Sequence, residues 1–150
     1  MSIDKDINQR KFRSEYQKSI INIIFTYGWV TEQIKQALEP ENITLQQFNI
    51  LRILRGSQTP LSTLQIRERM LDKMSDTSRI VDRLVIKELA KKVVSKNDKR
   101  LVDITITARG KKLLLKLDEH ENTFDKIVNS ISLAEAQTLN TLLDKIRKSN

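Results

Sequence analysis

Few side chains of this sequence could carry out catalysis. The chain of 150 residues contains no cysteine and one histidine, His120. The absence of cysteine excludes disulfides, thiolate metal ligands and a thiol nucleophile. A serine–histidine–aspartate triad or a metal site would have to be built around that single imidazole. We therefore expect a protein that is not an enzyme and that holds no metal or cofactor.

Positively charged side chains are concentrated in the middle of the chain, and they indicate binding. Residues 52–111 hold 15 Lys and Arg against 7 Asp and Glu, whereas residues 1–51 and 112–150 each hold 6 of either sign. The middle segment therefore carries the whole net charge of +8. A basic segment favours nucleic acid as the partner, although a merely solvated basic surface is an open alternative on charge alone.

A helix-turn-helix is predicted inside this basic segment. Ser62 and Gln65 have the spacing of a capping box, which opens a first helix with three apolar residues turned inward. These three are Leu64, Ile66 and Met70. A turn over residues 73–75 follows, and Ser75 is expected to cap the second helix.

The second helix has two different faces when about 100° is taken per residue. The inner face holds Thr77, Ile80, Val81 and Leu84, and the polar face holds Ser75, Ser78, Arg79, Asp82 and Arg83. Such a polar face is typical of a recognition helix that enters the major groove.

A β-hairpin is predicted directly after this helix. Val93 and Val94 begin it, and residues 102–106 alternate apolar and polar with the period of a strand. The polar segment 95–100 lies between them, and Asn97 and Asp98 are suited to its turn. A helix-turn-helix followed by a hairpin is a winged helix-turn-helix.

Helices are predicted on both sides of this unit. Apolar residues over 20–38 are too dense for a single buried stripe, and Pro40 stops that helix. Capping boxes begin at Thr44 and Ser132, and Thr107 caps a long helix that runs through Ile131. The fold class is mainly α, with about six helices and a hairpin wing in one domain, 1–150.

The arrangement of these parts resembles the MarR family of bacterial transcriptional regulators. Four stretches carry the resemblance, between Thr44 and Leu114: Thr44–Leu51, Ser78–Leu84, Asn97–Arg100 and Ile104–Gly110. The resemblance implies a DNA-binding lobe over 42–111 and helical arms over 8–40 and 112–148 that interlock two chains in a homodimer. The alternative is that the arms pack only within one chain. One departure is that Glu88 stands where the family usually has glycine, which leaves the exit from the recognition helix open.

We expect the DNA contacts on the recognition helix and the wing. The major-groove candidates are Ser75, Thr77, Ser78, Arg79 and Arg83, and the wing candidates for the minor groove are Lys96, Lys99 and Arg100. Arginine can grip guanine bidentately or lie along a phosphate. For Arg83 the alternative is an ion pair with Asp76 or Asp82 on its own helix.

Two acids on this basic surface are expected to orient the wing. The resemblance implies that Asp82 pairs with the wing residue Arg100 and holds the wing at a fixed angle. Asp98 has either a wing-orienting role or the plainer one of forming the Asn97–Asp98 turn.

The function implied by the resemblance is a sequence-specific regulator, a repressor released by a small aromatic or phenolic effector bound between the arms and the lobe. The aromatic candidates, Tyr16, Phe25, Tyr27, Trp29 and Phe124, could line that pocket or belong to a core. His120 is expected to be a polar helix residue. The rival interpretations are a non-specific architectural DNA-binding protein without effector, and a helical adaptor for an acidic protein. We expect a cytoplasmic location and no membrane partner, because the apolar runs are far shorter than a bilayer requires and the N-terminus has no apolar signal segment.

Overall fold

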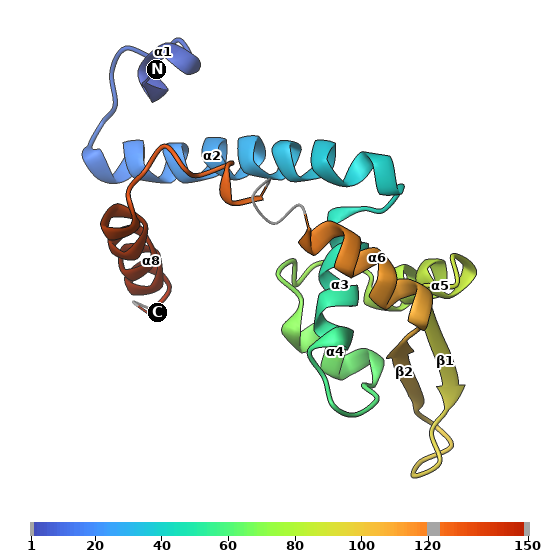
Figure 1. The fold of residues 1–150 in the computed structure, drawn as a ribbon. Helices are drawn as coiled ribbons and strands as arrows, with labels where there is room; N and C mark the ends of the chain where they lie inside the picture. The colour runs from blue at the N-terminus through green and yellow to red at the C-terminus, as the bar shows by residue number, and fades with distance from the viewer. Residues whose placement is uncertain (1, 120–123, 149–150) are drawn as a thin grey trace.

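The protein is mainly helical with one β-hairpin, as predicted (Figure 1). The computed structural model describes residues 2–119 and 124–148. Its elements are α1 (Ile3–Asp6), α2 (Glu15–Leu38), the 3-10 turn η1 (Glu39–Glu41), α3 (Leu45–Arg55), α4 (Thr63–Arg69), α5 (Thr77–Ile86), β1 (Ala90–Val94), β2 (Val102–Ile106), α6 (Ala108–Asp118) and α8 (Leu133–Arg147). We call the unit from α3 to α6 the winged lobe.

One hydrophobic core holds the winged lobe together. Its fully buried side chains come from α3, α4, α5, β2 and α6, and the end of α2 adds Leu38. Among them are Ile50, Leu51, Ile66, Met70, Leu84, Ile104 and Leu114. Leu64 does not take part: 63% of it is exposed on α4, so the prediction that it turns inward is wrong. A helix as short as α4 packs only Ile66 and the following Met70 into the core.

Local capping signals set most of the helix boundaries. The capping boxes predicted at Thr44, Ser62 and Ser132 are all present, and Thr107 Oγ1 accepts the backbone N–H of Gly110 at 3.0 Å. Hydrogen bonds from the Ser132 backbone and hydroxyl lower the pKa of the Glu135 carboxyl in the last of these boxes. The recognition helix differs, because it begins at Thr77 and its cap is Asp76, not Ser75.

The chain leaves α5 through a left-handed residue that is not glycine. Glu88 has φ 59°, and its N–H donates to the Val85 carbonyl while the N–H of Leu89 donates to the Leu84 carbonyl, both at 2.9 Å. This pair of bonds is a Schellman motif, which usually has glycine at the left-handed position. Arg109 Nη1 lies 2.7 Å from the Glu88 carboxylate in an exposed ion pair beside this exit. The chain therefore leaves α5 through the Schellman motif that is common at helix ends, with glutamate in place of the usual glycine.

Replacing Glu88 with glycine should stabilise the fold. The left-handed conformation costs a non-glycine residue about 1–2 kcal/mol, and glycine removes that cost. Glycine also loses more backbone entropy on folding, which reduces the gain by about 0.5–1 kcal/mol. Loss of the exposed ion pair with Arg109 reduces the gain by a few tenths of a kcal/mol at most. We expect Glu88→Gly to raise the free energy of unfolding by about 0.5 kcal/mol in denaturant titrations. Glu88→Ala is the control, because it removes the ion pair and keeps the strain; a glycine variant no more stable than the alanine variant contradicts the prediction.

The start of α6 fits against this exit only because residue 110 lacks a side chain. A Cβ atom at Gly110 would lie 2.3 Å from the Leu89 carbonyl oxygen and 2.8 Å from Cγ1 of Ile106. The hydroxyl of Thr107 donates to the Glu88 carbonyl at 2.7 Å, which fixes the same junction from the other side. The recognition helix, the wing and α6 are thus joined at one tightly packed point.

The wing is a two-stranded antiparallel sheet. β1 pairs with β2 in a register that places Ala90 opposite Ile106 and Val94 opposite Val102. Leu61, just before α4, adds a bridge to Ile104 with hydrogen bonds of 2.9 and 3.1 Å. Ile104 is fully buried, so the base of the wing is part of the lobe core while its tip extends outward.

The two long flanking helices lie largely outside this core. Figure 1 shows α8 below the N-terminal half of α2 and the winged lobe below its C-terminal end. Of the 24 residues of α2 only Leu38 is buried, and α8 has no buried residue. The helix predicted to run from Thr107 through Ile131 ends at Asp118, and residues 126–131 form turns, so that prediction is wrong. His120 lies outside the described residues.

Candidate DNA interface

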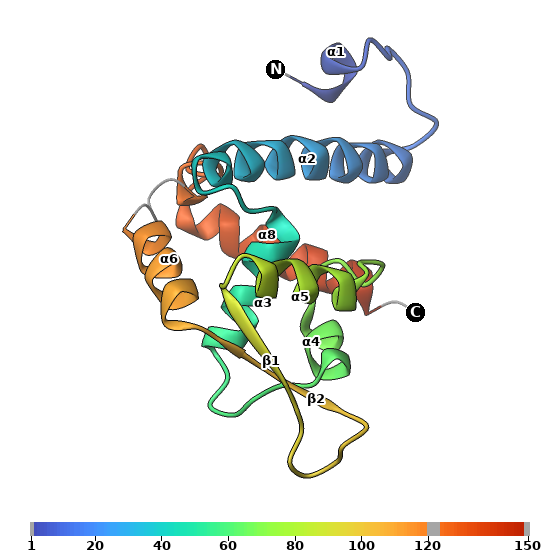
Figure 2. The same cartoon turned by 90° about the vertical axis from the view of Figure 1, so that its right-hand side faces the viewer.

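The outward side of the recognition helix carries arginine. Figure 2 shows α5 crossing in front of α3, with β1 descending from its end. Arg79 is 75% exposed, and its Nε lies 3.6 Å from Oδ2 of Asp76, the residue that caps the helix. Arg83 is exposed one turn further along. Its suggested partners are engaged elsewhere in the described chain, Asp76 with Arg79 and Asp82 with Lys92. Arg83 is therefore not paired with either of these acids, and Arg79 stays largely exposed despite its pair with Asp76.

Two of the short polar candidates point inward. Thr77 is only 4% exposed, and the hydroxyls of Thr77 and Ser75 are buried without a hydrogen-bond partner in the described structure. Ser75 lies in the turn because α5 starts one residue later than predicted, and Thr77 lies on the inner face of the helix with Val81 and Leu84, the face on which the sequence pattern also placed it. The expectation that Thr77 reaches a base or phosphate is corrected here, whereas Ser78 is exposed beside Arg79.

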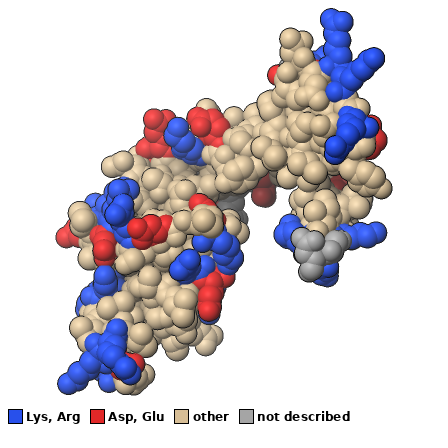
Figure 3. Space-filling view, turned by 180° about the vertical axis from the view of Figure 1, so that it is seen from behind, with Lys and Arg blue, Asp and Glu red and all other residues tan. Residues whose placement is uncertain are grey.

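The tip of the wing is a basic loop shaped by one aspartate. Asp98 Oδ1 accepts the backbone N–H of Arg100 at 2.9 Å and its Nε at 3.2 Å. Asp98 is therefore a turn-former, as one of the two interpretations held, and it also holds the base of the Arg100 side chain. Arg100 is nonetheless 90% exposed, and Lys96 and Lys99 are exposed beside it. Figure 3 shows Lys and Arg side chains gathered at this end of the molecule.

Asp82 pairs with a different wing residue from the one expected. Its Oδ1 lies 2.8 Å from Nζ of Lys92 on β1, and no Asp82–Arg100 pair forms in the described structure. The physical reason is that the two candidate partners lie at different positions along the hairpin. Lys92 stands near the base of the hairpin, beside α5, whereas Arg100 lies in the tip loop, where Asp98 is two residues away. Lys92 is the site residue that the sequence reasoning missed; an exposed lysine on a strand gives no sign of its partner.

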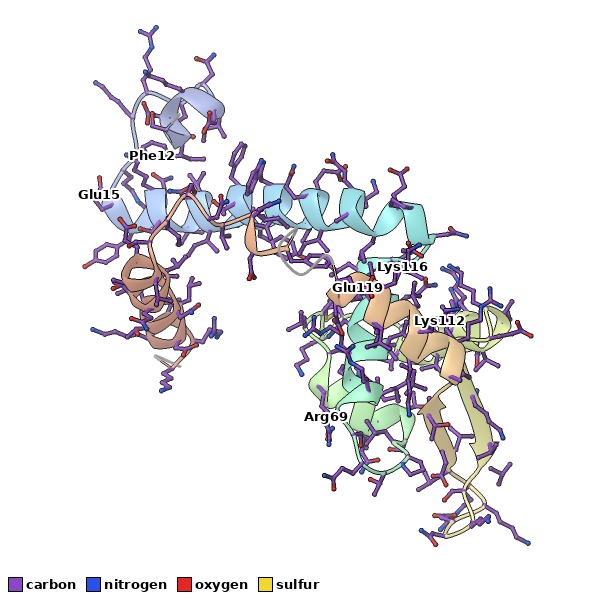
Figure 4. All side chains as sticks on the ribbon, in the orientation of Figure 1. Phe12, Glu15, Arg69, Lys112, Lys116 and Glu119 are labelled. Carbon is purple, nitrogen blue, oxygen red and sulfur yellow. The ribbon has the colours of Figure 1, made fainter. Side chains whose placement is uncertain are left out.

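Further positive charge lies on two other parts of the lobe. Arg67 and Arg69 lie in the last turn of α4, and Figure 4 shows Arg69 at the lower edge of the lobe. On the opposite side, Lys112 and Lys116 project from α6 near the end of α2 (Figure 4). Lys116 binds Glu41 of η1, so that lysine links α6 to the arm and is not free for DNA.

Two open hollows lie along α2. One of about 520 Å³ is bounded by α2, η1 and the start of α3, and Tyr27, Lys35 and Lys87 are among its lining residues. The other, of about 510 Å³, lies between α1 and α2 and is lined in part by Phe25 and Trp29.

The remaining aromatic candidates do not line these hollows. Phe124 stacks on Phe48 with ring centroids 5.5 Å apart and so packs against the lobe core, and Tyr16 is exposed at the start of α2. Among the described residues no group of acids and histidines could hold a metal ion, and no helix there is long and apolar enough to cross a membrane.

Comparison with known structures gives the same architecture. E. coli MarR, as a mutant complexed with operator DNA, superposes with a TM-score of 0.80 at 21% identity, covering 91% of this chain and 98% of that one. BpsR of Bordetella bronchiseptica, whose DNA binding is regulated by 6-hydroxynicotinic acid, gives a TM-score of 0.75 at 20% identity, with coverage of 85% and 91%. The MarR transcription factor of Planctomyces limnophilus gives 0.67 at 25% identity, with coverage of 89% and 98%.

Sequence comparison finds a relative with higher identity than these solved structures. No protein-family model matches the chain. The uncharacterized HTH-type transcriptional regulator YpoP of Bacillus subtilis (strain 168) is 31% identical over 120 residues, which are 79% of this chain and 84% of that protein. Given this identity over most of both chains and a winged lobe with the architecture of the MarR structures, the chain belongs to the MarR family of helix-turn-helix transcriptional regulators.

Proposed function

We propose that the protein is a sequence-specific repressor that binds an operator as a homodimer. The observation that carries this proposal is that Arg79 and Arg83 of α5 and the basic tip of the wing are all exposed on one lobe. Arginine on a recognition helix can read base edges in the major groove, and a basic wing tip suits the narrow, negative minor groove beside it. In this proposal residues 42–111 form the DNA-binding lobe.

The homodimer is supported by apolar surface that one chain leaves uncovered. Large apolar side chains on α2 and α8 remain exposed, although both helices are long and well capped. They are Tyr16, Ile20, Ile23, Ile24, Phe25, Tyr27 and Trp29 on α2, and Leu133, Leu139, Leu142 and Ile146 on α8. So many large exposed apolar side chains on two helices favour an interaction site. Two copies related by a two-fold axis would cover it and set two lobes apart, with arms 8–40 and 112–148 as the interface.

The effector part of the proposal rests on the hollow at the junction of arm and lobe. Tyr27 and Ile43 give that hollow apolar surface, and its charged lining is mixed: Lys35 and Lys87 line it together with Glu32 and Glu39, and Lys35 Nζ lies 3.6 Å from Glu32 Oε2. This lining suits a small aromatic or phenolic molecule that meets both apolar and polar groups. Lys87 also donates to the Asn42 carbonyl and, at 3.2 Å, to Oε1 of Gln47 at the start of α3. A ligand that withdrew Lys87 would disturb the link between α5 and the base of the arm. BpsR, which has the same fold, responds to 6-hydroxynicotinic acid.

The test is selection of bound fragments from genomic or randomised duplex DNA at about 0.15 M salt, followed by competition with unrelated duplex. A repressor enriches one two-fold symmetric sequence and resists the competitor. Enrichment of no sequence, with binding retained, identifies an architectural DNA-binding protein. Loss of all binding at this salt points to an adaptor for an acidic protein. Addition of aromatic acids to the bound complex then tests release.

Salt dependence provides a quantitative prediction. If each lobe neutralises about four phosphates, a dimer on one operator has about eight, and log K should fall against log[salt] with a slope of roughly −7. The slope is measured by fluorescence anisotropy of a labelled operator across a salt series. A slope shallower than about −3 shows that the positive charge of residues 52–111 is not the docking surface.

A second prediction concerns the wing. Because Asp82 holds Lys92 and not Arg100, a double-mutant cycle on operator affinity should give a coupling energy of about 0.5–1 kcal/mol per lobe for Asp82 with Lys92. The matched cycle of Asp82 with Arg100 should give a coupling near zero. The alanine variants of the three residues supply both cycles. Coupling in the Arg100 cycle with none in the Lys92 cycle reverses this assignment and restores the partner that the sequence suggested.

A further inference from the structure

The turn between α4 and α5 exposes two large apolar side chains. Leu71 is 82% exposed and Met74 is 92% exposed. Both belong to the winged lobe, so the proposed interface between the arms does not account for them. Met74 lies two residues before Asp76, the cap of the recognition helix, and so stands at the end of the helix that approaches base edges.

The backbone of this turn is held by hydrogen bonds. The N–H of Leu71 donates to Oδ1 of Asn49 on α3 at 2.9 Å, and the N–H of Met74 donates to Oδ1 of Asp72 at 3.0 Å. The N–H of Ser75 donates to the Asp72 carbonyl at 3.3 Å. The position of Met74 is therefore set by the fold, and its exposure does not come from an unattached loop.

Met74 is exposed on the same side of the lobe as the start of the recognition helix. Exposure alternates from Met74 to Ser78: Met74, Asp76 and Ser78 are exposed, whereas the hydroxyls of Ser75 and Thr77 are buried. Asp72, Asp76 and Arg79 also line one shallow hollow of about 390 Å³. The turn and the start of α5 are thus both exposed on this side of the lobe, and Met74 is an exposed apolar side chain of the turn beside the hollow.

The chemistry of the neighbours indicates what covers Met74. Asp72 and Asp76 flank Met74, and Asp76 is paired with Arg79, but residues 52–111 as a whole carry the net charge of +8, so the partner of this lobe is a polyanion. On the base edges of a DNA major groove the one apolar group is the C5 methyl of thymine. Methionine is unbranched and adaptable, and it can reach such a methyl from a position just outside the helix. We propose that Met74 contacts a thymine methyl in each half-site and makes thymine the preferred base there. This inference rests on the proposed operator binding.

The experiment removes only the methyl group. An operator is first selected from a randomised duplex library by the wild-type protein, and each selected thymine is then replaced singly by deoxyuridine. We expect one thymine per half-site at which the replacement weakens wild-type binding by about fourfold, the effect of one buried methyl group. For Met74→Ala the same replacement should change affinity by less than about 1.5-fold. Because Met74 is exposed, the variant should keep the fold and the circular dichroism of the wild type.

Leu64→Ala is the matched control, since Leu64 is an exposed leucine on α4 of the same lobe. It should retain the fourfold effect of deoxyuridine. The inference is overturned if no thymine of the selected operator is sensitive, if Met74→Ala keeps the sensitivity, or if Met74→Ala alters only the oligomeric state in sedimentation. If the wild-type protein selects no sequence from the library, the proposed function fails and the inference fails with it.

Discussion

Two glutamates on one face of α8 should convert the protein to monomers and abolish operator binding at working concentrations. Leu139 and Leu142 lie one turn apart on α8 and are both exposed within a single chain. Because α8 buries no residue in its own chain, Leu139→Glu with Leu142→Glu should cost the monomer little stability. In the proposed dimer each charge would be buried without a partner, at several kcal/mol.

The expected loss of operator affinity is at least about 100-fold, because two lobes joined in a dimer bind with an effective concentration that separate lobes lack. Sedimentation velocity gives the mass and anisotropy gives the affinity. Gln137→Glu with Thr141→Glu is the control, since it adds the same charge on the opposite face of the same helix. A compact dimer in the first variant means that the interface does not include this face of α8.

The second large effect is expected at Arg79. Loss of a bidentate contact with guanine costs about 1–3 kcal/mol per half-site, so Arg79→Ala should weaken dimer binding by about 30-fold or more. The loss should be specific: the base at one position of each half-site should become interchangeable. Asp76, which caps α5, lies 3.6 Å from the Arg79 Nε in an exposed ion pair.

Two variants separate base reading from charge at this position. Arg79→Lys keeps the charge and loses the planar fork, so it should also lose base preference. Arg100→Ala is the comparison at the wing, and it should weaken all sequences alike and lower the salt slope by about one per subunit. If Arg79→Ala behaves as Arg100→Ala does, Arg79 is a phosphate contact and base reading lies elsewhere on α5.

The features that the sequence predicted well depend on neighbouring residues. The capping box of Thr44 with Gln47 and the turn at Asp98 each involve side chains two or three residues apart, so spacing alone indicates them. The order of helix, turn, helix and hairpin follows from periodicity, and it is confirmed. The resemblance to the MarR family rested on the same stretches.

The features that the sequence predicted badly depend on how distant parts meet. The resemblance paired Asp82 with Arg100, and only the placement of the wing beside α5 selects Lys92 instead. Ser75 and Asp76 are adjacent and both are good caps, and the core position of Thr77 decides between them. The apolar residues up to Ile131 continue the helical pattern of α6, yet the chain turns after Asp118, and Phe124 stacks on Phe48 instead.

The junction at Leu89 constrains how this chain can vary over evolutionary time. At residue 110 even a methyl group would meet the Leu89 carbonyl oxygen, so each descendant that keeps this junction must keep glycine there. Residue 88 is subject to a far weaker restriction, because its left-handed conformation costs a side chain only about 1–2 kcal/mol and encounters no such overlap. Sequences that diverge from this one should therefore accept several residues at position 88, glycine most readily, while Gly110 stays fixed. The two positions record different kinds of selection, the first on stability alone and the second on whether the winged lobe can close.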